Sequence, residues 1–538
     1  MYKLVKDILK KHQKALILVF SVQIFSSAMS MILPFLNGKF VDLLVYATEF
    51  EQIKKFILIL LGITGLNVAL AYCYKIIVLK TKNKMSFALN IKMIEHLQKI
   101  PIELYEKYDP TYLNQRIKGD CEVVINFWLD NTVTIILNLF AIFFVFTILY
   151  SSNHILFVIA IAFIPLYCII YFFMKKPLYE RNINAVENSN LYFGHMNDIY
   201  LRNREIKVKC EFEKEKAKLR KSFEQFFCAS LKYSKMLYRL SASDNIVAVL
   251  FQSVLFIVGG QQVITKNMTI GQFSVMNTYF NMVLNLVKYY FGIGQTYQTV
   301  KISKQRLCEL MRIKEEVNGI KDIKTICKIY VSNFNYKFND KEVYRRKINF
   351  VIEKAGIYSI LGKNGTGKTT LINALIGIYN YAYVGEVSIN DINIKDINLY
   401  SLRKKMLSVM LQEEKLPSIN TRQFVFENIS TKAYDEALVD NRYEHVFFSD
   451  IFNIKNIFNR NVLELSSGEK QMLLLFVTLL KEADLFVLDE PTSNLYSELV
   501  DEVFELIRQK SDEGKIVIII SHDKRVASIS QPIYEILP

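Results

Sequence analysis

Long apolar runs in the N-terminal half of the chain restrict its fold more than any other feature of the sequence. A hydrocarbon layer about 30 Å thick needs roughly 20 helical residues to cross it, and each run reaches that length. The sequence therefore predicts membrane-spanning helices near 15–36, 56–79, 132–152, 154–174, 241–264 and 271–293. No small-residue cleavage site follows the basic N-terminal segment, so the first run is interpreted as a membrane helix and not as a signal peptide.

Two charged stretches, 80–130 and 175–240, separate some of these runs. Both keep apolar residues at helical spacing among many Lys and Glu side chains, which indicates helices that continue well into water. The helix breakers Pro101 and Asp109-Pro110 interrupt the first stretch. Because positive charge beside membrane spans favours the cytoplasmic side, we expect both stretches and both chain termini to be cytoplasmic.

Charge and cysteine content exclude other classes of protein. A net charge of +15 is also typical of nucleic-acid-binding proteins, but a soluble protein of that class has no long apolar runs. We therefore expect no nucleic-acid partner. The seven cysteines show no CxxC spacing, so they predict neither a metal site nor a disulfide framework.

The chain changes character after the sixth run. An amphipathic helical segment leads to a linker, and beyond it strand-like runs alternate with helical ones, at 329–334, 356–362, 485–490 and 516–522. This alternation is typical of a largely parallel sheet covered by helices. We predict a transmembrane domain at 1–312, a linker at 313–327 and an α/β domain at 328–538.

A glycine-rich loop between a predicted strand and a predicted helix carries the main chemical signal. The strand ends at Leu361, and Gly362–Thr369 reads GKNGTGKT. Backbone N–H groups of such a loop surround phosphate groups, and the helix N-terminus adds partial positive charge. Lys368 is placed to contact a γ-phosphate and Thr369 to bind Mg²⁺. The loop therefore predicts a site for ATP with Mg²⁺.

Two adjacent carboxylates follow a second buried strand, 485–488. Asp489 is predicted to hold Mg²⁺ through water, and Glu490 to orient the attacking water and accept its proton. A lone Asp-Glu pair after a strand is commonly a surface feature. Here it accompanies a phosphate loop, so we interpret the pair as catalytic.

With these residues in place, the whole chain resembles an ATP-binding cassette (ABC) exporter half-transporter. In this resemblance Gln412 matches the glutamine that reaches Mg²⁺, and His522 matches the histidine that contacts the γ-phosphate. Tyr336 matches the aromatic residue that stacks on adenine, and Leu465–Glu469 matches the family signature. The implied fold is an all-α six-helix transmembrane domain of the type I/IV exporter fold, followed by an α/β P-loop NTPase cassette.

The predicted site residues form three groups. The catalytic residues are Glu490 and His522, and the Mg²⁺ ligands are Thr369, Gln412 and Asp489. The remaining group binds the nucleotide and comprises Tyr336, Gly362, Lys363, Asn364, Gly365, Thr366, Gly367, Lys368, Thr369, Thr370, Gln412, Ser466, Ser467, Gly468 and Glu469.

The resemblance also implies a dimer. Ser466 is suited to cap the helix that follows it, so that hydroxyl, backbone N–H and helix dipole point outward together. In the family these groups face the γ-phosphate held by the opposite subunit, so ATP joins two cassettes. By the same resemblance, the turns near Glu103–Asn114 and Lys207–Lys214 are predicted to be coupling helices that rest on the cassettes.

Three residues depart from the family's pattern. Ser467 replaces a glycine, Glu469 replaces the commoner Gln, and Tyr496 stands where Asp is usual. These positions act on the nucleotide of the other subunit, whereas the residues that act on the chain's own nucleotide are intact. A heterodimer with one slower site and a homodimer are both compatible with this pattern. We favour the homodimer, because half-transporters of this size often pair with themselves.

A polar stripe at helical spacing marks the sixth run, at Asn277, Asn281, Asn285 and Lys288. Such side chains either line a cavity that contacts cargo or hydrogen-bond to a neighbouring helix, and both interpretations stay open. Asp244 and Gln252 in the fifth run raise the same question.

The predicted function is ATP-driven export of an amphipathic substrate (a peptide, lipid or drug) across the cytoplasmic membrane of a bacterium. Export would proceed by alternating access of a dimer, with the second half-transporter, the substrate and membrane lipid as partners. The alternative is an ATP-gated regulatory or sensory membrane protein with little transport. Glu490 and His522 argue against it, because a gate has no need of a hydrolytic base.

Overall fold

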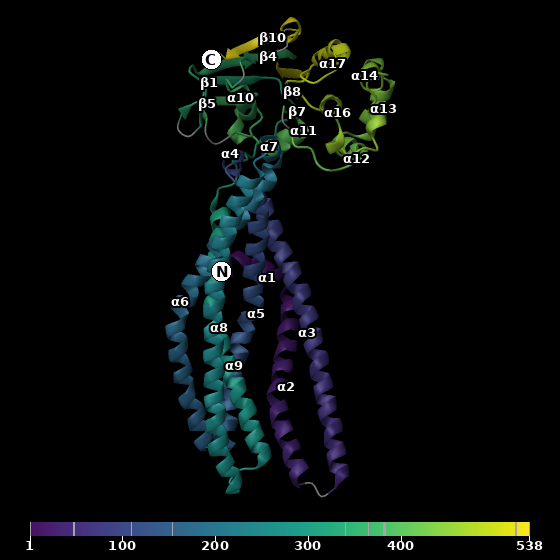
Figure 1. Ribbon diagram of the computed structural model, residues 1–538. Coiled ribbons are helices and arrows are strands. Elements are labelled where there is room, and N and C mark those ends of the chain that lie inside the picture. The colour runs from purple at the N-terminus through teal and green to yellow at the C-terminus, as the bar shows by residue number, and fades with distance from the viewer. Residues whose placement is uncertain are drawn as a thin grey trace. The chain divides into compact units, whose positions relative to one another are not determined.

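The computed structural model (Figure 1) describes residues 2–46, 49–108, 110–152, 154–338, 341–363, 365–379, 383–412, 414–495, 497–521 and 525–536. The chain divides into two compact units. The first comprises Met1–Glu95 and Pro110–Arg312, and the second comprises His96–Asp109 and Ile313–Pro538. The segment 96–109 thus packs with residues that are far from it in the sequence.

The first unit is helical. Its helices are α1 (Tyr2–Lys11), α2 (Gln13–Tyr46), α3 (Phe50–Gln98), α5 (Pro110–Ser152), α6 (His154–Leu201), α7 (Asn203–Lys209), α8 (Phe212–Ile264) and α9 (Ile270–Arg312), and α3 extends into the second unit. The longest of them, α8, has 53 residues, more than twice the roughly 20 that a membrane crossing needs. The long helices therefore continue well beyond the predicted spans.

Within the described residues, five helices are long and apolar enough to cross a membrane, namely α2, α3, α5, α6 and α8. The sixth predicted span, 271–293, lies inside α9 and is helical. The asparagine stripe and Lys288 lower the mean hydropathy of this span, and for this reason α9 is not among the five helices.

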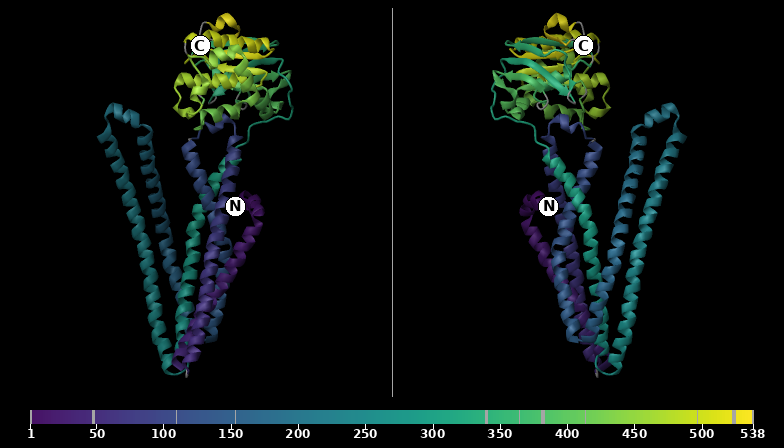
Figure 2. Two further views of the ribbon diagram at one scale, coloured as in Figure 1. Left: turned by 90° about the vertical axis from the view of Figure 1, so that its right-hand side faces the viewer. Right: turned by 90° about the vertical axis from the view of Figure 1, so that its left-hand side faces the viewer.

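Two groups of helices form the first unit. Helix α6 packs along α8, while α9 packs against α5 and α2, as Figure 2 shows. The apolar core between α5, α8 and α9 includes Val145, Phe251, Tyr279 and Val283. The Tyr279 hydroxyl donates a hydrogen bond to the Met31 carbonyl over 2.7 Å, so this buried aromatic residue also ties α9 to α2.

The polar stripe of α9 is divided between two environments. The Gln252 amide approaches Asn277 Oδ1 at 3.5 Å, and Lys288 Nζ lies 3.5 Å from Asp244 Oδ2. These contacts join α9 to α8, as the interhelical interpretation predicts. Asn281 and Asn285 are exposed on the surface of this unit, so the cavity interpretation stays open for them.

The second unit combines strands and short helices. Its elements are α4 (Ile102–Tyr105), β1 (Ile329–Phe338), β2 (Lys341–Glu342), β3 (Ile348–Ile352), β4 (Gly356–Gly362), α10 (Lys368–Leu375), β5 (Tyr383–Ile389), β6 (Ile392–Asn393), η1 (Ile394–Asp396), α11 (Leu399–Lys405), β7 (Leu407–Met410), α12 (Thr421–Asn428), α13 (Thr431–Val439), α14 (Asn441–Phe447), α15 (Ile454–Ile457), η2 (Val462–Glu464), α16 (Ser467–Leu480), β8 (Leu485–Asp489), η3 (Ser497–Leu499), α17 (Val500–Asp512), β9 (Ile516–Ile520), α18 (Val526–Ile529) and β10 (Gln531–Ile536). Each of the two turns predicted as coupling helices overlaps a short helix. These helices are α4, in the turn after α3, and α7, in the turn before α8.

The described strands form two sheets: the parallel sheet that the sequence predicts, and a second, antiparallel sheet that it does not. The parallel sheet has the order β10-β4-β9-β8-β7, and the second sheet contains β2, β1, β5 and β6 in order, with β3 also paired to β1. The run at 329–334 belongs to β1, which pairs antiparallel with β3 and β5. Strand alternation with helices does not reveal such pairings, because they join segments distant in the sequence.

The parallel sheet brings the candidate functional residues to one edge. Strands β8 and β9 are buried at every residue, as expected for a sheet covered on both faces. In register, Met410 pairs with Leu488 and Asp489 with Ile520. The residues that follow β4, β7, β8 and β9 therefore emerge at the same edge of the sheet.

The predicted linker lies along the second unit. Its Glu316 N–H donates to the Lys99 carbonyl over 2.6 Å, and its Gly319 N–H donates to the Ile397 carbonyl over 2.9 Å. A Cβ atom at Gly319 would lie 1.9 Å from the Asp396 backbone, so only glycine permits this approach. Arg403 binds the Glu316 carboxylate with two hydrogen bonds of 3.1 Å. The linker is therefore attached to the second unit along much of its length.

We expect Arg403→Gln to destabilise this unit by about 1–3 kcal/mol, because it leaves the nearly buried Glu316 carboxylate without its cation. Thermal and chemical unfolding of the whole chain measures this loss. Lys321→Gln is the matched control, because its pair with Asp396 is more than half exposed and should contribute less than about 1 kcal/mol. Equal effects of the two substitutions would contradict the assignment.

Candidate active site

The glycine-rich loop joins the end of β4 to the start of α10. Gly365 and Gly367 have φ angles of 78° and 96°, a left-handed region that residues with a Cβ adopt at a cost. Lys368 Nζ donates to the carbonyls of Gly362 over 2.7 Å and Lys363 over 3.0 Å, which places the ammonium inside the loop. Burial lowers the pKa of Lys368, and the nearby carboxylates of Glu490 and Asp489 oppose this effect.

A hydrogen bond connects the loop helix to the first carboxylate. Thr369 Oγ1 donates to Asp489 Oδ2 over 3.3 Å, and Asp489 is only 2% exposed. The two residues are 120 positions apart in the sequence, and the fold makes them neighbours. Hydroxyl and carboxylate oxygens are the ligands that Mg²⁺ prefers, so this pair fits such an ion.

The second carboxylate residue lies on a tightly held turn. Glu490 has a φ angle of 51°, a conformation that persists in a non-glycine residue only where the surroundings enforce it. Its N–H donates to the Ile520 carbonyl over 2.8 Å. The Gln471 amide donates to the carbonyls of Glu490 over 2.9 Å and Pro491 over 3.0 Å. Strand β9 and helix α16 together fix this turn.

Sequence reasoning missed Gln471. It is 9% exposed and stands between Lys470 and the apolar run of α16 that begins at Met472. A buried amide must find hydrogen-bond partners, so a glutamine two residues after the signature, directly before an apolar run, was a usable signal. Its partners are the backbone carbonyls of the carboxylate turn, which the sequence does not identify.

The signature forms the start of α16. The predicted cap is present, because Ser466 Oγ accepts from the Glu469 N–H over 3.3 Å while Glu469 Oε2 accepts from the Ser466 N–H over 2.8 Å. This reciprocal pair is a capping box. Ser466 and Ser467 are exposed, so the helix N-terminus with its partial positive charge faces solvent.

Arg460 accounts for the unusual glutamate of the signature. Its guanidinium donates to Glu469 Oε1 over 2.6 Å and to the Glu464 carbonyl over 3.1 Å. Partial burial would raise the pKa of Glu469, but the Ser466 N–H and the Arg460 guanidinium outweigh it and hold the pKa below its usual range. The Glu469 carboxylate is thus ionised, and the Arg460 guanidinium neutralises its charge. The carboxylate also accepts a hydrogen bond from the start of its own helix.

The other predicted site residues have varied environments. Gln412 follows β7 at the shared sheet edge and is exposed. Tyr336 is 4% exposed, and its ring stacks on Tyr379 with centroids 5.2 Å apart. Burial raises the pKa of Tyr336, and the Glu103 carboxylate adds to this shift. Its role at adenine stays a prediction.

Some predicted residues cannot be placed. Asn364 and His522 lie outside the described residues, as does Tyr496, so their roles stay predictions. Thr366 and Thr370 are described and lie in the loop and in α10.

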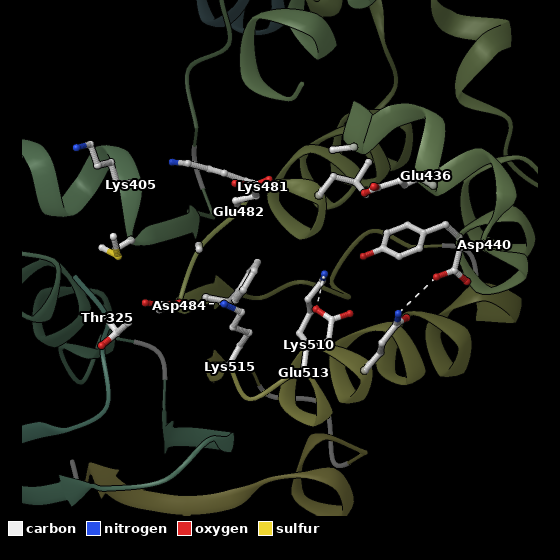
Figure 3. A pocket seen from close by; sticks show the side chains of 18 of the residues that line it. Thr325, Lys405, Glu436, Asp440, Lys481, Glu482, Asp484, Lys510, Glu513 and Lys515 are labelled. Carbon is white, nitrogen blue, oxygen red and sulfur yellow. Dashed lines mark hydrogen bonds and ion pairs between the residues drawn. The ribbon is translucent and has the colours of Figure 1, made fainter. Parts of the chain in front are cut away.

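A pocket of about 530 Å³ opens at the opposite edge of the parallel sheet (Figure 3). It is bounded by Met406, Asp484 and Lys515, which precede β7, β8 and β9. The ion pair of Lys515 with Asp484, at 2.9 Å, lies on its wall. None of the described residues of the predicted phosphate site lines this pocket, so the two features are at different ends of the strands.

Comparison with known protein families shows the family to which this chain belongs. The family model for the ABC transporter transmembrane region matches residues 16–287, which is more than half of the chain. The family model for the ABC transporter matches residues 345–493. The chain belongs to the ABC transporter family. It is therefore a multi-pass membrane protein with an ATP-binding domain, as the sequence predicts.

Curated ABC relatives are distant but extend over most of the chain. The transport/processing ATP-binding protein ComA of Streptococcus pneumoniae is 20% identical over 86% of this chain, which spans only 65% of ComA's length. The ATP-dependent lipid A-core flippase of Pasteurella multocida is 22% identical over 82% of this chain and 76% of its own. The lactococcin-G-processing and transport protein LagD of Lactococcus lactis is 23% identical over 86% of this chain and 66% of its own.

A solved structure confirms the predicted exporter fold. A bacterial Atm1-family ABC exporter with ATP bound matches with a TM-score of 0.80 at 16% sequence identity. The match covers 98% of this chain and 95% of that exporter. At this identity the likeness establishes the fold.

Glu469→Gln restores the residue commoner in the ABC signature, yet we expect it to destabilise the protein by about 0.5–1 kcal/mol at pH 7. Gln retains the capping geometry but loses the charge pair with Arg460. Since the folded-state pKa of Glu469 is depressed, its contribution is present above the unfolded-state pKa of about 4.3 and is lost as pH falls through the folded-state value.

Chemical unfolding between pH 7 and pH 3 measures this pH dependence. The stability of wild type and Glu469→Gln should converge in acid. Glu464→Gln is the control, because the Glu464 side chain is exposed and only its backbone carbonyl accepts from Arg460. A difference between Glu469→Gln and wild type that persists undiminished at pH 3 would show that the ion pair is not its source.

Proposed function

We propose that this chain is an exporter half-transporter that hydrolyses ATP with Mg²⁺ and uses the energy to move an amphipathic substrate out of the cytoplasm. The observation that carries the proposal is the Thr369–Asp489 hydrogen bond of 3.3 Å. It brings together a hydroxyl and a buried carboxylate beside the phosphate loop, in a chain whose other unit has membrane-crossing helices. One relative named for lactococcin-G processing and transport and another named as a lipid A-core flippase support an amphipathic cargo.

The described residues have distinct tasks in this reaction. The backbone N–H groups of the loop and the Lys368 ammonium bind the phosphates. Thr369 and Asp489, with Gln412, would hold Mg²⁺, which when bound neutralises charge that develops on the phosphate oxygens. Glu490 orients the attacking water and takes its proton. The hydrogen bonds that hold its turn fix the position of the Glu490 backbone.

The active form is proposed to be a dimer, with a second copy of this chain as the favoured partner. The exposed N-terminus of α16, with Ser466 and Ser467, would face the γ-phosphate on the other subunit. A carboxylate at position 469 would repel that phosphate, but Arg460 neutralises it at 2.6 Å. The N-terminus of α16 therefore keeps a positive electrostatic potential that attracts an anion, although the signature is altered. Both chain termini would lie in the cytoplasm, on the side of the cassettes.

Glu490→Gln should lower ATP hydrolysis on the order of 10²-fold or more, because it removes the proton acceptor, while ATP binding persists. The measurement is ATPase activity and retained nucleotide of the full chain in lipid nanodiscs. Glu502→Gln, at an exposed position of α17, is the matched control and should leave both values unchanged. Undiminished hydrolysis in Glu490→Gln would overturn the proposed mechanism.

A panel of peptides, lipids and drugs, tested for stimulation of this ATPase, separates export from the regulatory alternative. Stimulation by one class identifies the cargo. An ATPase that no member of any class stimulates, together with ATP-dependent movement of none of them, would favour an ATP-gated regulatory protein.

A further inference from the structure

A tyrosine outside the phosphate loop makes direct contact with it. Tyr344 lies between β2 and β3 and is 4% exposed. Its hydroxyl donates to the Gly367 carbonyl over 2.7 Å. Gly367 is the N-cap of α10, and the same carbonyl accepts the first helical hydrogen bond from the Leu371 N–H over 3.0 Å. Two donors therefore fix the direction of this carbonyl.

The tyrosine ring also packs closely against the loop. A Cβ atom placed at Gly367 would lie 2.8 Å from the Tyr344 ring and 2.9 Å from the Val343 side chain. Such distances are far below van der Waals contact, so the ring occupies the space beside the Gly367 Cα. The hydroxyl and the ring thus restrain the same peptide unit from one side.

Tyr344 is itself held by a buried amide. Asn335, which is 2% exposed, donates through Nδ2 to the Tyr344 carbonyl over 2.9 Å and accepts from the Tyr344 N–H over 3.1 Å. The amide reproduces the pair of hydrogen bonds that a neighbouring strand would make, and so attaches Tyr344 to β1. Burial raises the pKa of Tyr344, which keeps the hydroxyl protonated and able to donate.

We propose that Tyr344 is a positioning residue for the phosphate loop and sets the affinity of the site for ATP. In a planar trans peptide the C=O and the following N–H point in opposite directions. When Tyr344 fixes the Gly367 carbonyl, the Lys368 N–H points away from Tyr344. It belongs to the first turn of α10, and in the proposed site the N–H groups of this turn bind a phosphate.

This inference rests on the proposed function, because it concerns nucleotide binding at the same loop. It adds a residue that none of the loop, carboxylate or signature motifs contains. Tyr336, the aromatic residue expected near the nucleotide, stacks on Tyr379, whereas Tyr344 is the aromatic side chain that contacts Gly367.

Tyr344→Phe tests the role of the hydroxyl, because it keeps the ring and removes only the donor. We expect the Kd and KM for Mg-ATP to rise about 3- to 10-fold, the effect of one hydrogen bond, with kcat at saturating ATP within about twofold of wild type. The measurements are displacement of trinitrophenyl-ATP and steady-state ATPase, both with the full chain in lipid nanodiscs.

Two further variants separate positioning from general stability. Tyr358→Phe is the matched control: its hydroxyl also donates to a backbone carbonyl, that of Lys354 at 2.9 Å, but away from the loop, so ATP affinity should not change. p-Aminophenylalanine at position 344 restores an N–H donor and should recover at least part of the lost affinity.

The outcomes are distinguishable. A Tyr344→Phe protein with wild-type Kd and KM, or one with only a lower melting temperature, overturns the inference. So does a loss of affinity that p-aminophenylalanine fails to restore. If the wild-type chain itself does not bind ATP, the proposed function fails and the inference falls with it.

Discussion

The burial of Asp489 is the constraint on which the arrangement of the cassette depends. Its carboxylate ends a strand that is buried throughout and is itself 2% exposed. An ionised group in such a place is unfavourable unless donors or cations surround it. The Thr369 hydroxyl at 3.3 Å supplies one donor, and Lys368 lies close enough for its pKa to respond to Asp489. The phosphate loop therefore has to lie against the end of β8.

The same edge couples the carboxylate turn to the signature helix. Gln471 lies one turn into α16 and binds the backbone of Glu490 and Pro491. The N-terminus of that helix carries Ser466, which the proposed dimer directs at the other subunit's nucleotide. A displacement of α16 by the partner would thus reach the backbone of Glu490, the proposed hydrolytic residue, through the buried Gln471 amide.

Helix α10 is restrained at both ends by residues that are distant in the sequence. Tyr344 donates to the carbonyl at its N-cap. Arg403 donates to the Ile376 carbonyl at 3.2 Å and to that of Gly377, where the helix ends. Since Arg403 also binds Glu316, the linker and the phosphate-loop helix share one guanidinium. A movement of the linker would therefore act on the C-terminal end of α10 through Arg403.

The sequence by itself determined the features that are encoded locally. Apolar runs of membrane length, the spacing of glycines before Lys368, and adjacent carboxylates after a buried strand each depend on residues close together in the chain. For the same reason Ser466 could be identified as a helix cap from its neighbours. The family and the exporter fold followed from these features in their order along the chain, and both were confirmed.

Tertiary structure decided everything that joins distant segments. The antiparallel pairing of β1 with β5, the Arg403 guanidinium on Glu316, and the contact of Tyr344 with Gly367 have no signature in local spacing. Buried donors, acceptors and charges must be paired, but the sequence does not say which distant group is the partner. That choice is made only when the strands pack and bring their ends to one edge.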